Sequence, residues 1–281
     1  MPDAPATRVP APARRARPTH TMTVLRREQL SPHLVRIVAG GAGFDTFTPS
    51  ESTDAYCKIW FGRDGRPLDG SVSLETLREQ TPREDWPVSR TYTVRWVDMA
   101  RRELAMDFVV HGDAGLAGPW AENAQPGDVL TFGGPGGGFA PDPEADWYLF
   151  AADESALPAT AAALEALPQG AVGHAFIEVD GPADELPLTA PAGVVVTWLY
   201  RGGAKPTGNL LIAAVDALPW HPGDVQVFAH GEREAMKGLR DIFFNRHKLD
   251  RSRVSLSGYW ADGRTEDTFQ AEKRTPIGKI L

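Results

Sequence analysis

Apolar and polar positions alternate in short segments through the first half of the chain, as in residues 34–38 and 104–108. A period of two is typical of a β-strand with one buried face. Strands are predicted over Thr21–Arg27, His33–Ala39, Asp54–Phe61, Arg90–Asp98, Glu103–His111 and Asp128–Phe132. Because no strong, long helical pattern interrupts them, these six segments predict an antiparallel β-barrel. Residues 62–88, rich in Arg, Asp, Gly and Pro, are predicted to form a long surface loop.

The second half of the chain has a different hydrophobic pattern, in which short apolar runs alternate with segments of helical periodicity. Strands of the buried type are predicted over Trp147–Ala151, His174–Val179, Val194–Leu199, Val225–Ala229 and Arg253–Tyr259. Helices are predicted over Leu157–Leu167, Gly208–Leu218 and Glu232–Arg246, the last with an apolar stripe along one side. Strands that alternate with helices favour a parallel α/β sheet.

The length of 281 residues, 42% of them apolar, is enough for two ordinary domains. We expect a disordered tail over residues 1–19, because this segment is rich in Pro and Arg and has no apolar stretch of the signal-peptide type. A barrel domain is expected over residues 20–138 and an α/β nucleotide-binding domain over residues 139–281. The predicted fold is therefore α+β with two domains.

Composition excludes several classes of protein. No run of 18 apolar residues occurs, so no membrane-spanning segment is expected, and a net charge of −8 argues against general nucleic-acid binding. No group of Cys and His residues has metal-ligand spacing, so we expect no metal site of the protein's own. The single cysteine, Cys57, rules out an internal disulfide and fits a reducing cytoplasm, and its predicted strand favours core packing over a reactive thiol.

A cofactor site is suggested by Arg90 and Tyr92, which stand two residues apart in a predicted strand and so point to the same face. The guanidinium fork suits a pair of phosphate oxygens, and the Tyr ring offers a flat face to a flavin ring. Residues 115–121, which contain two glycines, could supply backbone N–H groups to the same phosphates. Ordinary β-propensity is the alternative for Tyr92 and Thr93 taken alone.

Five motifs in this order resemble the siderophore-interacting proteins, the bacterial FAD-dependent ferric-siderophore reductases related to ferredoxin reductases. The motifs are Arg90-Thr91-Tyr92-Thr93, Asp107-Phe108-Val109-Val110-His111-Gly112, the segment from Gly115 to Asp128, residues 152–159, and Gly258-Tyr259-Trp260. The resemblance extends from about Thr21 to near the end of the chain. It implies a barrel that binds FAD, followed by a ferredoxin-reductase-like domain for NAD(P)H.

The same resemblance implies roles in the barrel. Arg90 would bind the FAD pyrophosphate, Tyr92 would stack on the isoalloxazine, and Thr93 would hydrogen-bond a ring heteroatom, with Thr91 in the same motif. The strand with Asp107, Val109 and His111 would run beside the adenosine and pyrophosphate. A plain turn residue is an equal alternative for His111.

The glycine-containing segment departs from the family pattern, which usually has serine where Gly118 stands and proline where Leu116 stands. The departure removes a hydroxyl donor but leaves the backbone N–H groups of Ala117 and Gly118, so we expect weaker retention of FAD without its loss. Trp120 is expected to pack over the adenine side or the barrel wall. The run over residues 133–138 opens no helix, so it is either a hinge or a flavin-facing turn.

Asp153, Glu154 and Ser155 follow a predicted buried strand, at the edge where ligands bind in parallel sheets. We assign them to the flavin edge and the nicotinamide pocket, with a helix N-cap as the alternative.

Glu178 and Asp180 stand at the end of the next predicted strand, where an acidic side chain is expected to bind the ribose 2′-hydroxyl of NADH and to repel the extra phosphate of NADPH. No Lys or Arg occurs from residue 141 to residue 200, but Arg201 and Lys205 just beyond could reverse this preference. NADH is therefore only slightly favoured.

The end of the chain carries a basic cluster, from which Lys237, Arg240, Lys248 and Arg251 are assigned to the substrate. They could form an electropositive rim for an anionic ferric siderophore, or simply a solvated surface. Tyr259 and Trp260 are expected to cover the isoalloxazine, with core packing as the alternative.

These assignments predict an FAD-dependent ferric-siderophore reductase, cytoplasmic and monomeric. Electrons from NADH or NADPH, or from ferredoxin, would pass through the flavin to siderophore-bound Fe(III), and Fe(II) would be released. The flavin would do the chemistry, with no catalytic side chain. The alternatives are another flavin oxidoreductase of the ferredoxin-reductase type and a non-catalytic siderophore-binding protein.

Overall fold

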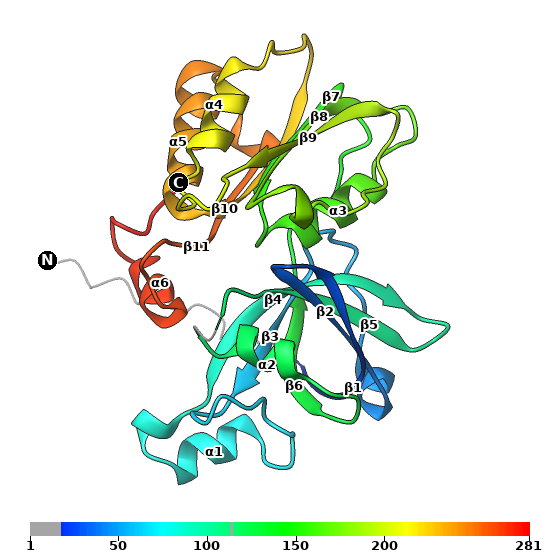
Figure 1. Cartoon of the computed structure of the whole chain (residues 1–281), viewed down its shortest axis with the longest axis vertical. Helices are drawn as coiled ribbons and strands as arrows, with labels where there is room; N and C mark the ends of the chain where they lie inside the picture. The colour runs from blue at the N-terminus through cyan, green and yellow to red at the C-terminus, as the bar shows by residue number, and fades with distance from the viewer. Residues whose placement is uncertain (1–17, 113–114) are drawn as a thin grey trace, which may run out of the picture.

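The computed structural model of the chain describes residues 18–112 and 115–281 (Figure 1). Most of the tail expected over residues 1–19 lies outside the described residues. Its last two residues, Pro18 and Thr19, are described, and the first strand already begins at Thr19.

Six antiparallel strands close into a barrel in the order β1-β2-β5-β4-β3-β6, which confirms the predicted barrel. They are β1 (Thr19–Ser31), β2 (Leu34–Gly40), β3 (Tyr56–Phe61), β4 (Val88–Asp98), β5 (Glu103–Val109) and β6 (Val129–Gly136). The last strand, β6, pairs with both β1 and β3, so closure leaves no open sheet edge.

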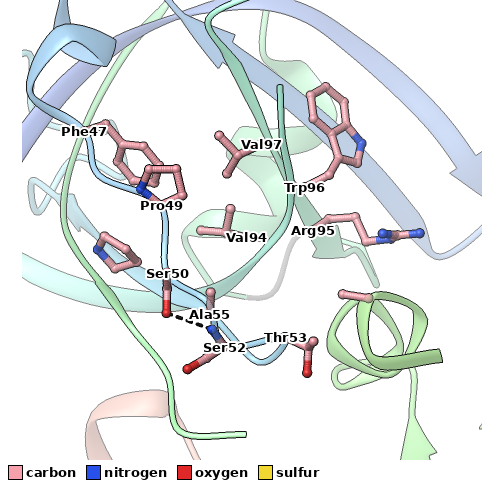
Figure 2. Close-up of a pocket in the computed structure, with 12 residues that line it drawn as sticks. Phe47, Pro49, Ser50, Ser52, Thr53, Ala55, Val94, Arg95, Trp96 and Val97 are labelled. Atoms are coloured by element: carbon pink, nitrogen blue, oxygen red, sulfur yellow. Dashed lines mark hydrogen bonds between the residues drawn. The ribbon is translucent and has the colours of Figure 1, made fainter. Parts of the chain in front are cut away.

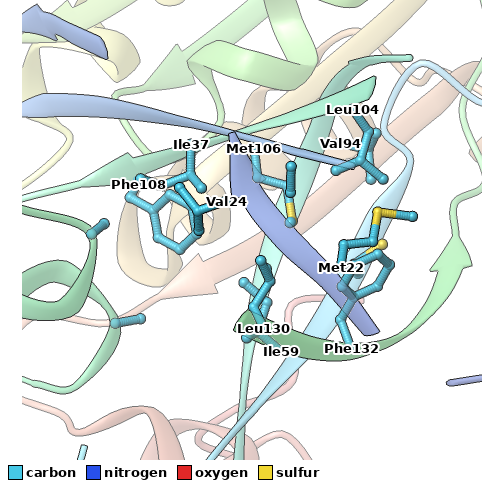
Figure 3. Packing of buried hydrophobic residues seen from close by; sticks show 14 of the residues in the cluster. Met22, Val24, Ile37, Ile59, Val94, Leu104, Met106, Phe108, Leu130 and Phe132 are labelled. Atoms are coloured by element: carbon cyan, nitrogen blue, oxygen red, sulfur yellow. The ribbon is translucent and has the colours of Figure 1, made fainter. Parts of the chain in front are cut away.

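The barrel interior is filled by side chains that alternate along each strand. In β3, Cys57, Ile59 and Phe61 are buried, whereas the residues between them are half-buried. Figure 3 shows Ile59 in one cluster with Met22 of β1 and with Phe132 of the neighbouring strand β6. Full burial of such a side chain contributes about 1.5–3 kcal/mol. The core position predicted for Cys57 is confirmed.

Five parallel strands form the second sheet in the order β11-β10-β7-β8-β9, as the alternating pattern predicts. They are β7 (Trp147–Asp153), β8 (Val172–Val179), β9 (Gly193–Tyr200), β10 (Val225–Glu232) and β11 (Val254–Trp260). Helix α3 (Leu157–Glu165) covers one face, where Tyr148 and Phe150 of β7 are buried. Helices α4 (Asn209–Ala217) and α5 (Arg233–Arg240) cover the other, where Leu149 and Ala151 are buried.

Several short elements were not predicted. They are the helices α1 (Leu74–Gln80), α2 (Ala117–Asn123) and α6 (Glu266–Glu272), and the 3₁₀ turns Ala42–Thr46, Arg83–Asp85, Pro182–Asp184 and Arg251–Arg253. Each is too short for a periodic pattern to develop. The expected loop over residues 62–88 therefore contains a helix. The helix expected over Glu232–Arg246 changes to a π-helix at Asp241–Arg246.

The carboxyl ends of the parallel strands face the barrel (Figure 1). Leu34 of β2 packs there against Ile177 and Val179 at the end of β8. Asp184 accepts hydrogen bonds from Ser31 Oγ (3.0 Å) and from the backbone N–H of His33 (3.3 Å). Because ligands bind at this edge of parallel sheets, the junction with the barrel is where a site is sought.

In residues 18–112 and 115–281, no helix has both the length and the apolar character needed to cross a membrane.

Candidate functional site

Arg90 and Tyr92 lie on β4, as predicted. The guanidinium of Arg90 is 15% exposed and pairs with Asp267 of α6, with Nη1–Oδ1 and Nη2–Oδ2 distances of 3.3 and 3.4 Å. The ring of Tyr92 packs on Phe108 of the barrel core, with centroids 4.1 Å apart and an interplanar angle of 33°. Burial raises the pKa of the Tyr92 hydroxyl, so this residue is a neutral flat surface.

Thr93, the next residue, belongs to a hydrogen-bonded chain that crosses from the barrel to the sheet. Its side chain is buried and hydrogen-bonds the hydroxyl of Tyr259 on β11. That hydroxyl lies 3.0 Å from Nδ1 of His230, whose Nε2 lies 2.9 Å from Ser255 Oγ. Burial lowers the pKa of His230 to about 3, so its ring is neutral at physiological pH.

Asp153 at the end of β7 is a buried hub. One carboxylate oxygen accepts from the backbone N–H and hydroxyl of Ser155. The other accepts from Trp260 Nε1 and from the backbone N–H of Glu232, both at 2.8 Å. Burial raises the pKa of this carboxyl group. Asp153 is therefore occupied with fixing Trp260 and the end of β10, and is not turned outward to a ligand as the sequence suggested.

The end of β10 was missed by the sequence analysis. A Cβ atom at Gly231 would lie 2.7 Å from Asp153 Oδ2, so only glycine lets the carboxylate approach. Glu232 caps α5, accepting from the backbone N–H groups of Glu234 and Ala235. The signal was available, because His230 and Gly231 lie between the predicted strand Val225–Ala229 and the helix predicted to begin at Glu232.

Glu178 is 2% exposed and lies beneath Arg201, with a carboxylate–guanidinium distance of 3.6 Å. Arg201 also forms a bidentate ion pair with Glu154. Burial raises the pKa values of both carboxyl groups. The carboxylate expected to meet a ribose is thus covered by a guanidinium, which is itself only 10% exposed and paired with two carboxylates.

Asp107 also has an internal partner. Its carboxylate takes two hydrogen bonds from Arg36, its cross-strand neighbour, at 2.7 and 2.8 Å. Assigning Asp107 to the cofactor is therefore not supported. Val109 packs in the apolar cluster between barrel and sheet. His111 lies beyond the end of β5 and is exposed.

Helix α2 places Ala117 and Gly118 in its first turn, where backbone N–H groups have no intrahelical acceptor. No side chain caps these groups. A Cβ at Gly118 would lie 3.3 Å from the Val109 carbonyl oxygen, so the small residue lets α2 pack closely. Trp120 packs edge-on against Phe108, with centroids 5.5 Å apart, which is the barrel-wall position.

The late basic cluster does not adjoin Trp260 as expected. Lys248 and Arg251 precede the start of β11, whereas Trp260 ends it, and seven residues of strand separate the two edges by about 20 Å. Lys237 and Arg240 donate to backbone carbonyl groups of the C-terminal segment, at 2.7 and 3.1 Å.

Two other lysines lie closer to β4. Lys58 Nζ is 3.4 Å from Thr91 Oγ1, and Lys273 follows α6, with its Nζ 4.5 Å from the centroid of Phe269. Burial, together with the charge of Lys58, lowers the pKa of Lys273.

A pocket of about 260 Å³ lies further along β4 (Figure 2). Val94, Val97 and Phe47 turn toward it, and Ala162 of α3 also lines it. Pockets for drug-sized ligands span about 300–1,000 Å³, so this one is too small for a dinucleotide.

The residues around β4 fit a flavin dinucleotide. Arg90 has an exposed carboxylate as its counter-ion, Tyr92 offers a flat ring, Thr93 offers a hydroxyl, and the first turn of α2 has uncapped N–H groups. These are the donor types that a diphosphate and an isoalloxazine require.

Comparison with known families supports the assignment of a flavin site to the barrel. The model of the siderophore-interacting FAD-binding domain matches residues 23–139, and the siderophore-interacting protein model matches residues 145–263.

Three curated relatives span most of the chain. An uncharacterized protein of Mycobacterium tuberculosis is 50% identical, over 92% of this chain and 95% of its own. The ferric vibriobactin reductase ViuB of Vibrio cholerae is 34% identical, over 89% and 92%. The NADPH-dependent ferric-chelate reductase of Escherichia coli is 33% identical, over 85% and 91%.

Solved structures agree. A siderophore utilization protein from T. fusca is 37% identical, with a TM-score of 0.78 over 88% of this chain and 94% of that one. The ferredoxin–NADP⁺ reductase of Plasmodium falciparum, 12% identical with a TM-score of 0.63 over 86% and 96%, shares the fold.

Proposed function

The chain belongs to the siderophore-interacting protein family, and from this membership we propose that it is an FAD-dependent reductase of ferric siderophores. The observation that carries the proposal is the contact between Thr93 of the barrel and Tyr259 of the sheet. It brings the strand that carries the flavin-type residues against the strand ends where a nicotinamide would bind.

The chain's share of the reaction is to bind, orient and shield the cofactor. Arg90 and the first N–H groups of α2 would hold the diphosphate, and Tyr92 would support one face of the ring. Thr93, fixed by Tyr259, would direct a hydroxyl at the ring edge. When bound, FAD would supply the chemistry that links a two-electron hydride donor to one-electron transfer.

Trp260 would cover the ring on the sheet side, because Asp153 holds its indole in place. Fe(III) is the substrate, and Fe(II) would leave because siderophores bind it far more weakly. Because the siderophore itself holds the iron, no side chain of the protein is needed as an iron ligand.

A reduced nicotinamide nucleotide is the proposed electron donor. The slight preference for NADH rested on Glu178, and Arg201 now covers that carboxylate. Arg201 is itself only 10% exposed and is paired with Glu154 and Glu178, so this edge offers neither a free carboxylate to a ribose nor a free guanidinium to a 2′-phosphate. The relative in E. coli is named an NADPH-dependent reductase. We therefore withdraw the preference for NADH.

An anionic ferric siderophore would approach over Lys58 and Lys273. These amines lie on the side of β4 and α6, where the flavin-type residues gather, and neither forms an ion pair within the described residues. A pair of cations raises the local concentration of anions, although Glu266 partly offsets the charge of Lys273.

The proposal is tested by adding FAD and following flavin absorbance in the absence of oxygen. NADH or NADPH should bleach the bound flavin, and a ferric siderophore should restore its colour. A protein that binds no FAD would refute the proposal, whereas bound FAD that no donor bleaches would favour a non-catalytic binding protein.

A further inference from the structure

Helix α6 lies between the edge strand β11 and the barrel, where Figure 1 shows it in red. It is anchored to the sheet side: Phe269 is buried, and Glu272 forms an ion pair with Arg233 at the start of α5. Its first turn carries two carboxylates, Glu266 and Asp267, toward β4.

Asp267 contacts Arg90 in the geometry that a phosphate would adopt. Two carboxylate oxygens face two guanidinium nitrogens, at 3.3 and 3.4 Å. The Asp267 side chain is 60% exposed, whereas Arg90 is 15% exposed. An exposed, long ion pair of this kind is weak, and a diphosphate with more oxygens and more charge can displace it.

We infer that Asp267 is an internal competitor for the flavin diphosphate at Arg90, and that it determines which flavins bind tightly. This inference rests on the proposed function. The carboxylate keeps the guanidinium paired and oriented when no nucleotide is present. A flavin must replace this contact, so a diphosphate is favoured and a flavin without phosphate gains nothing from Arg90.

The test is a double-mutant cycle on FAD affinity, measured by titration of flavin fluorescence with the full-length protein. Asp267→Asn should tighten FAD about two- to fivefold, the range of an exposed ion pair. In the Arg90→Ala background, Asp267→Asn should leave the affinity for FAD unchanged. Asp267→Glu should keep the wild-type affinity, and riboflavin affinity should not respond to Asp267→Asn.

The matched control is Asp262→Asn, which removes the same charge from an exposed position before α6 and should leave FAD affinity unchanged. Equal tightening by Asp267→Asn with and without Arg90 would make Asp267 a general repulsive charge and overturn the inference. An unchanged FAD affinity in Asp267→Asn would overturn it too. Both results leave the proposed function intact, whereas a wild-type protein that binds no FAD would overturn both.

Discussion

Arg90 is the side chain on which nucleotide binding should depend most, because its fork suits a diphosphate. Arg90→Ala should weaken FAD by about ten- to a hundredfold, the loss of a charge-assisted hydrogen bond worth ~1.5–3 kcal/mol. Because FMN lacks the diphosphate bridge, its affinity should fall less than that of FAD. Titrations with both nucleotides measure this, with the exposed Arg101→Ala as a control. Equal losses for FAD and FMN would move Arg90 away from the diphosphate.

His230 should make stability depend on pH. Its pKa falls from the ordinary 6.5 to about 3 on folding, so its contribution is complete above about pH 6.5 and is lost as the pH falls toward 3. At pH 5 the free energy of unfolding should be lower by ~2 kcal/mol because of this residue.

Urea unfolding at pH 7 and pH 5 tests this by comparing the wild type with His230→Gln. The comparison removes the contributions of other histidines with lowered pKa values, such as His20 and His174. Identical pH dependence in the two proteins would contradict a buried, neutral His230.

At the scale of residues, the sequence predicted correctly which side chains of a single strand lie on the same face. Arg90 and Tyr92 share a face because they are two residues apart. It could not predict that Asp107 pairs with Arg36, because that contact depends on the register between β2 and β5. The indole of Trp260 on Asp153 joins residues 107 positions apart, which no local pattern records.

At the scale of elements, the turn from β10 into α5 is closely packed against the end of β7. Gly231 has φ 155°, and a Cβ there would lie 2.7 Å from Asp153 Oδ2. Gly231→Ala should cost about 1–3 kcal/mol through overpacking. Gly181→Ala, with no atom within 4 Å of the added Cβ, is the control and should be nearly neutral. Thermal unfolding compares the two, and equal melting temperatures would contradict the close packing at Gly231.

Long, periodic elements were predicted well, and short ones were not. The strands of both sheets and helices α3 and α4 carry apolar patterns of the required period. Helix α6 has only seven residues, so no periodicity marks it, although it holds the counter-ion of Arg90.

At the scale of the whole molecule, the parallel sheet separates the basic cluster from the candidate site. Lys248 and Arg251 precede β11, whereas Trp260 ends it. Reversing both charges, Lys248→Glu with Arg251→Glu, should therefore leave the KM for an anionic ferric siderophore unchanged. Lys58→Glu should raise it. Steady-state kinetics at low salt measures both, and a raised KM in the double variant would place the substrate at the far edge.

The division into domains near residue 138 and the monomeric state both stay predictions. The order of barrel and sheet was predictable because the change from period two to alternating strands and helices is visible along the chain. How the two halves meet was not, because it depends on contacts such as that of Ser31 with Asp184, which join residues far apart in the chain.

Turnover of a ferric siderophore by FAD-loaded protein, with a chelator that traps and colours Fe(II), tests the central claim most directly. NADH, NADPH and reduced ferredoxin are each supplied as donor. The account predicts Fe(II) formation with a nicotinamide donor, in proportion to bound FAD, and its loss in Arg90→Ala at limiting FAD. A protein that holds FAD but forms no Fe(II) with any of the three donors would contradict it.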